Sequence, residues 1–220
     1  MTTPNIPAGR RYGSDDESIG AWLLLHKRAV TWAAIAVAVI LGGYWFYQRS
    51  QSIKAQRAES AYFQARQSAA AGNLPLAVSD LQKVVVRYEG TRAGTQAALS
   101  LAQALYFQKK FKDGIAALKK AESSTPGEFR ASIHVLEAAG YEELKDFVAA
   151  AEQYNLAAKA TEFPVDKAKY QGAAARDYMV AGKTEEARRI WTELAKDDTK
   201  PEAAEARVRL GELTAKPMKI

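Results

Sequence analysis

The sequence predicts an all-α protein in which a single transmembrane helix is followed by a solenoid of helical hairpins and a C-terminal capping helix. Three observations predict this fold class. Residues 29–47 form one uncharged apolar block. From about residue 55 onward, turn signals such as Gly72-Asn73 and Phe163-Pro164 separate segments of helical length. Within those segments, small and bulky side chains recur at a nearly constant period, which is typical of stacked helical repeats.

The residues before the apolar block fall into two predicted parts. Residues 1–13 contain two prolines and two glycines and are expected to form a disordered tail. Residues 14–28 are expected to form a short interfacial amphipathic helix. Acidic residues follow Ser14 at its start, and apolar side chains, including Trp22, recur on one side. We expect this helix to lie along a membrane surface.

The apolar block, Ala29–Tyr47, is predicted to be the transmembrane helix. A helix of this length extends about 28 Å, close to the roughly 30 Å hydrocarbon core of a bilayer. Basic residues bracket the block and aromatic residues gather at its far end, as expected where side chains meet lipid headgroups. Gly42 and Gly43 are expected to allow close packing against another membrane helix. The predicted membrane-interface residues are Trp22, Lys27, Arg28, Trp32, Tyr44, Trp45, Phe46, Tyr47 and Arg49.

Two other interpretations of this block exist. A buried core helix would need a domain large enough to surround it, which the rest of the chain does not offer. A cleaved signal peptide would need small residues at its end, where bulky aromatics follow Gly43. Basic residues are equally frequent on the two sides, so charge counting does not fix the orientation. The pair Lys27-Arg28 beside the block favours a cytoplasmic N-terminus.

Residues 48–220 are predicted to form a repeat domain of about four hairpins plus a cap. A small residue marks the second helix of each hairpin, at spacings of 37, 36 and 37 residues. A bulky residue follows each marker after four positions, and an alanine precedes each by twelve. Small residues let two helices approach closely, and the bulky residue fills the space against the next pair. This arrangement resembles the tetratricopeptide repeat. The markers are Ala77, Gly114, Ala150 and Ala187.

The last predicted helix, residues 202–214, follows Pro201 and has the character of a C-terminal capping helix. Many of its side chains are charged and are expected to face solvent. Val208 and Leu210 are expected to face inward, against the last hairpin.

Composition and residue pattern exclude several classes of function. The net charge is +6, but acidic residues are interspersed among the basic ones, so the basic stripe of nucleic-acid-binding proteins is missing. Cysteine is absent, which excludes disulfides and thiolate metal sites. The two histidines, His26 and His134, are far apart, and no nucleophile–base pair or phosphate-binding glycine loop occurs. We therefore expect a protein that is not an enzyme and has no cofactor or metal, with His134 packed between helices.

A surface for protein partners remains. In a superhelix of helix pairs, the first helices line the concave side, and Tyr, Arg and Met are common in protein interfaces. Tyr62 and Tyr106 have a second interpretation, in which they only pack within the repeats. The residues predicted to line a partner-binding groove are Tyr62, Arg66, Gln103, Tyr106, Glu142, Arg176 and Met179.

The whole layout resembles the YfgM-like family of ancillary subunits of the bacterial Sec translocon. The resemblance implies a single-pass protein of the bacterial inner membrane, with a cytoplasmic N-terminus and periplasmic repeats. It implies partners in the translocon, reached through the span, and among periplasmic chaperones, reached through the repeats. The residues that carry the resemblance are Asp15-Asp16-Glu17, Trp22–Leu25, the span with its aromatic end Tyr44–Tyr47, and the polar helix Gln48–Ala71 with Ala58–Tyr62.

Two other functions fit the same sequence. A structural accessory subunit of another large membrane complex, respiratory or photosynthetic, would use the span and its aromatic residues as its main contacts. An envelope assembly factor, acting on peptidoglycan or the outer membrane, would use the repeat groove. The predicted partners are the lipid bilayer, a membrane protein complex, and a periplasmic protein or peptide, without nucleic acid.

Overall fold

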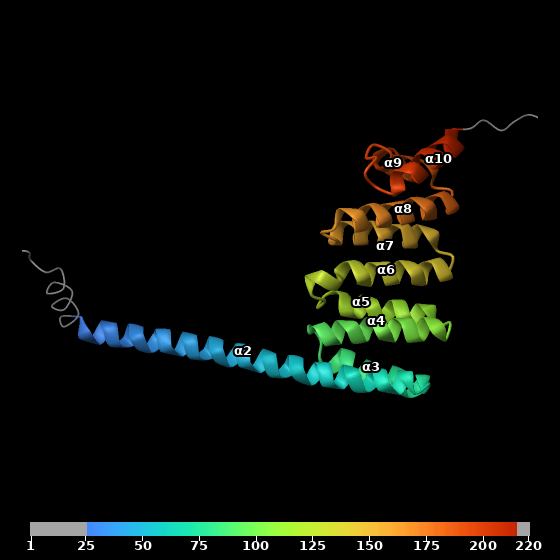
Figure 1. Cartoon of the computed structure of the whole chain (residues 1–220). Coiled ribbons are helices and arrows are strands. Elements are labelled where there is room, and N and C mark those ends of the chain that lie inside the picture. Colours follow the sequence, from blue (N-terminus) through green and yellow to red (C-terminus); the bar gives the residue numbers. More distant parts are fainter. Residues whose placement is uncertain (1–25, 215–220) are drawn as a thin grey trace, which may run out of the picture. The chain divides into compact units, whose positions relative to one another are not determined.

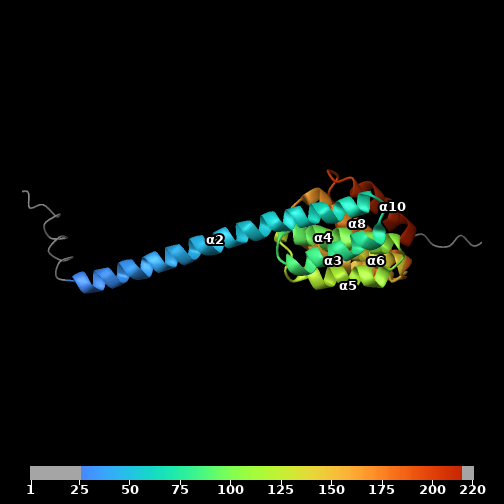
Figure 2. The same cartoon turned by 90° about the horizontal axis from the view of Figure 1, so that it is seen from below.

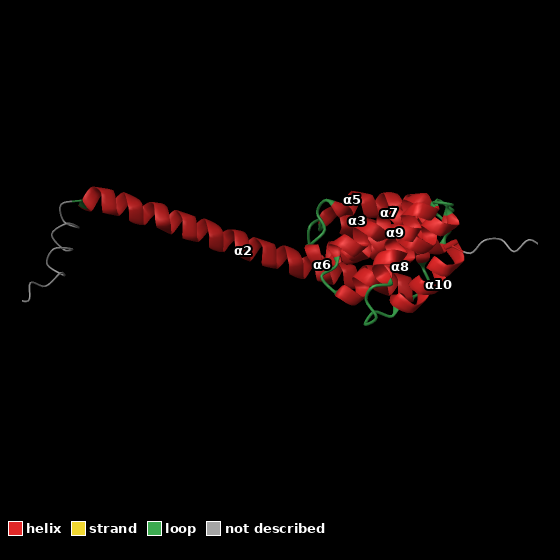
Figure 3. Cartoon of the chain, turned by 90° about the horizontal axis from the view of Figure 1, so that it is seen from above, coloured by secondary structure: helices red, strands yellow, loops and turns green. Residues whose placement is uncertain are grey.

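The computed structural model describes residues 26–214, and all regular structure in that range is helical (Figures 1 and 3). The predicted tail and the predicted interfacial helix up to residue 25, with Trp22, lie outside the described residues. The prediction of an all-α fold is confirmed. The described helices are α2 (Lys27–Ala70), α3 (Leu74–Arg87), α4 (Arg92–Phe107), α5 (Phe111–Glu122), α6 (Gly127–Glu143), α7 (Phe147–Ala160), α8 (Pro164–Val180), α9 (Thr184–Leu194) and α10 (Glu202–Thr214).

The chain divides into two compact units, Met1–Ser52 and Ile53–Ile220, which are described separately. The first unit holds the part of α2 that is long and apolar enough to cross a membrane. None of this apolar stretch is buried, which excludes the alternative of a core helix. A Cβ atom added at Gly42 or Gly43 would meet no atom within 4 Å. The predicted interface residues that the structure describes in this unit are exposed: Lys27, Arg28, Trp32, Tyr44, Trp45, Phe46, Tyr47 and Arg49.

The second unit is a stack of helical hairpins. Its first hairpin joins the end of α2, residues 53–70, to α3. The later hairpins are α4–α5, α6–α7 and α8–α9, followed by α10 alone. Figure 1 shows α3 to α10 stacked in chain order, and Figure 2 views the same stack from the side that carries α3. The predicted hairpin solenoid with a capping helix is therefore confirmed.

The repeat register read from the sequence coincides with buried positions of this stack. The marker residues Ala77, Ala150 and Ala187 are fully buried, and Gly114 is buried as well. The alanines twelve residues before the markers are also fully buried. Small side chains at these points let the helix backbones approach closely, so the recurring residues form the contact rows of the solenoid. These alanines are Ala65, Ala102, Ala138 and Ala175.

Each hairpin reverses direction through the same backbone motif. The residue five positions before the marker has a positive φ, which belongs to the left-handed region. The next residue donates its N–H to the carbonyl five residues back, at 2.8–3.1 Å. This is the Schellman arrangement that commonly ends helices. The φ values are 77° at Gly72, 60° at Lys109, 60° at Lys145 and 73° at Gly182.

We expect the two kinds of turn residue to respond oppositely to substitution. Gly182→Ala should lower the free energy of unfolding by about 1 kcal/mol, because alanine is strained in the left-handed region. A Cβ there would meet nothing within 4 Å, so the effect isolates the backbone. Lys145→Gly should raise stability by about 0.5 kcal/mol, since the strain it relieves exceeds the added unfolded-state entropy. Urea denaturation of both variants checks this, and shifts in the same direction would contradict it.

The C-terminal end of the stack holds the largest fully buried side chain, Trp191. Its Nε1 donates to Met179 Sδ at 3.3 Å, which joins α9 to α8. The prediction that Val208 faces inward is wrong, because this side chain is 61% exposed. The inward side of α10 follows a three–four–three spacing that leaves Val208 on the opposite side. The residues of α10 on the inward side are Ala203, Ala206, Leu210 and Leu213.

Candidate partner-binding site

Three adjoining clefts lie along one edge of the stack, where each hairpin passes to the next. The first, of about 770 Å³, lies between α5, α6 and α7. The second, of about 580 Å³, lies between the starts of α6 and α8 and the end of α7. The third, of about 530 Å³, lies between the α7–α8 loop, α8 and α9. We call this surface, lined by residues between Lys119 and Lys200, the edge trough.

The three clefts adjoin one another, because neighbours share lining residues. The first and second share Gly127, Ala160 and Glu162. The second and third share Thr161, Glu162 and Phe163, which form the α7–α8 loop. This short loop joins α7 to α8 without filling the space between the ends of the two helices. The edge trough therefore follows from short connections between hairpins.

The first and third clefts occupy equivalent places in successive hairpins. Four lining positions of the first recur in the third, 37 residues later in the sequence. A smaller cleft, of about 100 Å³, holds the corresponding place one hairpin earlier, between α3, α4 and α5. The hollows therefore recur with the repeat. The equivalent pairs are Gly127 and Pro164, Arg130 and Lys167, His134 and Gln171, and Leu156 and Glu193.

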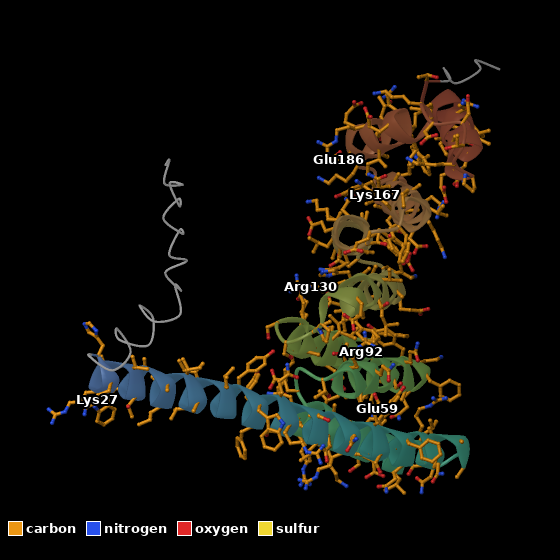
Figure 4. All side chains as sticks on the ribbon, turned by 60° about the vertical axis from the view of Figure 1, so that its left-hand side comes forward. Lys27, Glu59, Arg92, Arg130, Lys167 and Glu186 are labelled. Carbon is orange, nitrogen blue, oxygen red and sulfur yellow. The ribbon has the colours of Figure 1, made fainter. Side chains whose placement is uncertain are left out.

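The edge trough combines exposed apolar side chains with charged ones. Phe163 is 69% exposed and Leu156 is 39% exposed. Exposed apolar side chains rimmed by polar ones are typical of surfaces that bind other proteins. Figure 4 shows Arg130 and Lys167 on successive layers of the stack. This combination gives the surface both area to bury and charges to fix the position of a partner.

The charges of the edge trough differ in how far they are neutralised. Glu128 pairs with Arg92 at 2.8 Å, and Glu193 pairs with Lys196 at 2.6 Å. In the part of the chain that the structure describes, Arg130, Lys159 and Lys167 make no ion pair. These three cations are therefore available to an incoming anion.

The residues predicted to line a groove lie at the other end of the hairpins. All seven belong to the second halves of the first helices, whereas the edge trough uses the first turns of α6 and α8. Only Arg66, Gln103 and Arg176 are exposed. The other four are half-buried, and their role in a partner-binding groove stays a prediction: Tyr62, Tyr106, Glu142 and Met179.

Tyr62 and Tyr106 connect neighbouring hairpins. The hydroxyls of Tyr62 and Ser100 share a hydrogen bond of 2.9 Å between α2 and α4. Tyr106 donates its hydroxyl to a main-chain carbonyl of α6 at 3.0 Å. Its ring fills a slot between Gly114 and Gly140, where an added Cβ would come within 2.7 Å of a ring atom. These contacts support the packing interpretation of both tyrosines.

Glu142 and Arg176 flank a buried acid on α8. Asp177 is 6% exposed, and its Oδ2 has no hydrogen-bond partner within residues 26–214. The pKa of Asp177 is raised to about 7, mainly by burial and also by Glu142, against an opposing effect of Arg176. Arg176 Nη1 also lies 2.8 Å from Glu205 Oε2, which joins α8 to α10.

A second buried acid, Glu137, lies beside the floor of the first cleft. It is 1% exposed, and its pKa is raised to about 7, mainly by burial and also by Glu122, against an opposing effect of Lys119. His134 is buried nearby, with Nδ1 2.9 Å from Gln153 Oε1 on α7. His134 thus packs between helices. Among residues 26–214, no group of three His, Asp or Glu side chains is placed to hold a metal ion.

The edge trough was not predicted from the sequence, although two signals for it were present. Phe163 precedes Pro164 in a turn, where a large apolar side chain has little to pack against. The recurrence of a cation 20 residues before two of the markers, at Arg130 and Lys167, was a second signal.

Comparisons with known proteins agree with the architecture. A family model described as a tetratricopeptide repeat-like domain matches residues 21–215. A crystal structure from Podosopora anserina, of TPR-like repeats that are nearly identical to one another, matches this chain with a TM-score of 0.52 and 17% identity. The match covers 71% of this chain and 85% of that chain. A thermophilic TPR protein of Thermus thermophilus matches with a TM-score of 0.45 and 21% identity, over 71% and 80% of the two chains. No curated protein sequence matches the chain.

Proposed function

Because the chain belongs to the tetratricopeptide repeat-like domain family, we propose that it is a membrane-anchored scaffold that binds other proteins. Stacked helical repeats present extended surfaces and rarely carry chemistry of their own. The observation that carries this proposal is the edge trough, a row of adjoining clefts with exposed Phe163 and Leu156 among charged side chains. Arg66, Gln103 and Arg176 form a second proposed contact face.

The anchor of this scaffold is the first part of α2. Its apolar side chains are exposed along the whole stretch, and aromatic residues cluster at Tyr44–Tyr47. Such side chains are stable in a bilayer and costly in water. We propose a single-pass protein of the bacterial inner membrane with a cytoplasmic N-terminus and periplasmic repeats.

Within that class, we propose an ancillary subunit that links the Sec translocon to periplasmic chaperones. The resemblance of the layout to the YfgM-like family supports this assignment. In this arrangement α2 packs beside the translocon, with Gly42 and Gly43 allowing close approach. The edge trough binds the chaperone.

Purification of the full chain from its membranes in mild detergent, followed by mass spectrometry of retained proteins, tests this function. We expect translocon subunits together with a periplasmic chaperone. Phe163→Ser should lose the chaperone and keep the translocon, because it removes exposed apolar area only from the edge trough. Val208→Ser, a similar change on exposed α10, is the matched control. Full retention of the chaperone by Phe163→Ser would contradict the proposed site.

A second candidate is a structural accessory subunit of a respiratory or photosynthetic complex. The exposed aromatic cluster at Tyr44–Tyr47 favours it, since such residues also form contacts between membrane subunits. Recovery of one such complex at fixed stoichiometry, without translocon subunits, would establish it. Recovery of cell-wall or outer-membrane assembly proteins would instead indicate an envelope assembly factor.

A further inference from the structure

We propose that the edge trough binds an extended acidic segment of a partner protein, whose carboxylates pair with Arg130 and Lys167 in successive hairpins. This inference rests on the proposed scaffold function and specifies the chemistry of its partner.

The equivalence of the first and third clefts carries the proposal. Arg130 and Lys167 stand at the same position of consecutive repeats, and each lines one of the two clefts. Neither cation is neutralised by a carboxylate in the described part of the chain. Two equivalent sites in adjoining clefts fit a ligand that is itself extended and carries charge at two points.

The second cleft lies between the two cations, and its lining determines whether the central residue of the ligand is apolar or charged. Tyr170 and the acids Glu128 and Asp166 line only the second cleft, Phe163 lines the second and the third, and Glu162 lines all three. A carboxylate placed there would meet like charge, whereas an apolar side chain would pack on the rings. The surface therefore favours two acidic groups that flank an apolar residue.

Helix spacing sets the distance between those acidic groups. Packed helices lie about 8–10 Å apart, so two first helices separated by one second helix are at most roughly 20 Å apart. An extended chain rises about 3.3 Å per residue, so about six residues cover that distance. We infer that the acidic groups of the ligand are separated by about six residues or fewer.

Fluorescence anisotropy with the full chain in detergent micelles tests the inference. The probe is a labelled peptide with two Glu-Glu pairs separated by a spacer of about six residues with a central leucine. The control peptide has the same composition with its four glutamates adjacent. We expect the spaced peptide to bind about threefold more tightly than the control peptide. Arg130→Glu/Lys167→Glu should weaken its binding about tenfold, and less so at high salt.

The matched variant is Arg57→Glu/Lys112→Glu, which makes the same charge change on exposed positions outside the edge trough and outside the second proposed contact face. Its affinity for the spaced peptide should stay near that of the native chain. No measurable binding, equal binding of both peptides, or equal losses in the two double variants would overturn the proposal. Inorganic polyphosphate that displaces the peptide more effectively than unlabelled peptide would also overturn it, because the site would then be a general polyanion site.

The peptide-binding experiment can fail without contradicting the proposed scaffold function, and the reverse also holds. Peptide binding is measured on the purified chain and does not depend on which proteins its membranes contain. If the charge-reversed variant loses the peptide but still recovers its native partner, the partner binds elsewhere and only this inference fails.

Discussion

Trp191→Ala is expected to lower the free energy of unfolding of the repeat region by about 3–5 kcal/mol. The indole is fully buried in the C-terminal core, where Ile190 and Leu194 pack beside it. Its removal leaves a cavity between α8, α9 and α10, and it also deletes the hydrogen bond to Met179. Urea denaturation followed by circular dichroism measures the loss.

The location of the damage distinguishes this effect from general weakening. Solenoid contacts are local, so hydrogen exchange should accelerate in α8–α10 more than in α4–α5. Trp32→Ala is the matched control, because Trp32 is 72% exposed and lies outside the repeats. A loss below about 1 kcal/mol for Trp191→Ala, or uniform acceleration along the stack, would contradict the assigned role of this core.

Glu137→Gln is expected to stabilise the repeat region at pH 8 by about 3 kcal/mol relative to the native chain. The pKa of Glu137 is raised from 4.5 to about 7 by burial. Folding therefore binds a proton between these values, so the native chain loses stability as the pH rises from about 4.5 to about 7. Glutamine keeps the shape of the side chain and cannot ionise.

Comparison of the two proteins across pH isolates this group from every other acid. The stability difference should be near zero at pH 4, grow between about pH 4.5 and 7, and level off above. Glu143→Gln, one turn and a half further along α6 and exposed, should give a flat difference. A difference that shrinks as the pH rises would show that the carboxylate is stabilised in the fold.

The hairpin register could be predicted from the sequence because it depends on residue size. Alanine at a helix contact has few substitutes, so the buried rows of Ala65, Ala102, Ala138 and Ala175 are visible without coordinates. Glu137 is an exception to this register that the sequence also shows. Its equivalents in the neighbouring hairpins are Leu101 and Ala174, both buried, so a charged residue stood in a core row.

The partner surface could not be predicted equally well, because it depends on space between elements. Whether Tyr106 faces outward is decided by Gly114 and Gly140, which belong to other helices and open a slot for its ring. The edge trough depends on how much of the gap at the α7–α8 loop the side chains leave unfilled. The spacing of residues within one helix predicts neither the exposure of Tyr106 nor the space left open at the α7–α8 loop.

The succession of contacts along the stack has a further consequence for folding. Most helix contacts join an element to the next one in the chain; beyond these, α4 reaches back to α2, α6 to α4 and α10 to α8. Such low contact order is associated with fast folding, since little loop-closure entropy is lost before contacts form. Each hairpin needs only the hairpin before it. We expect the repeats to fold in order as the chain emerges, with the core around Trp191 completed last.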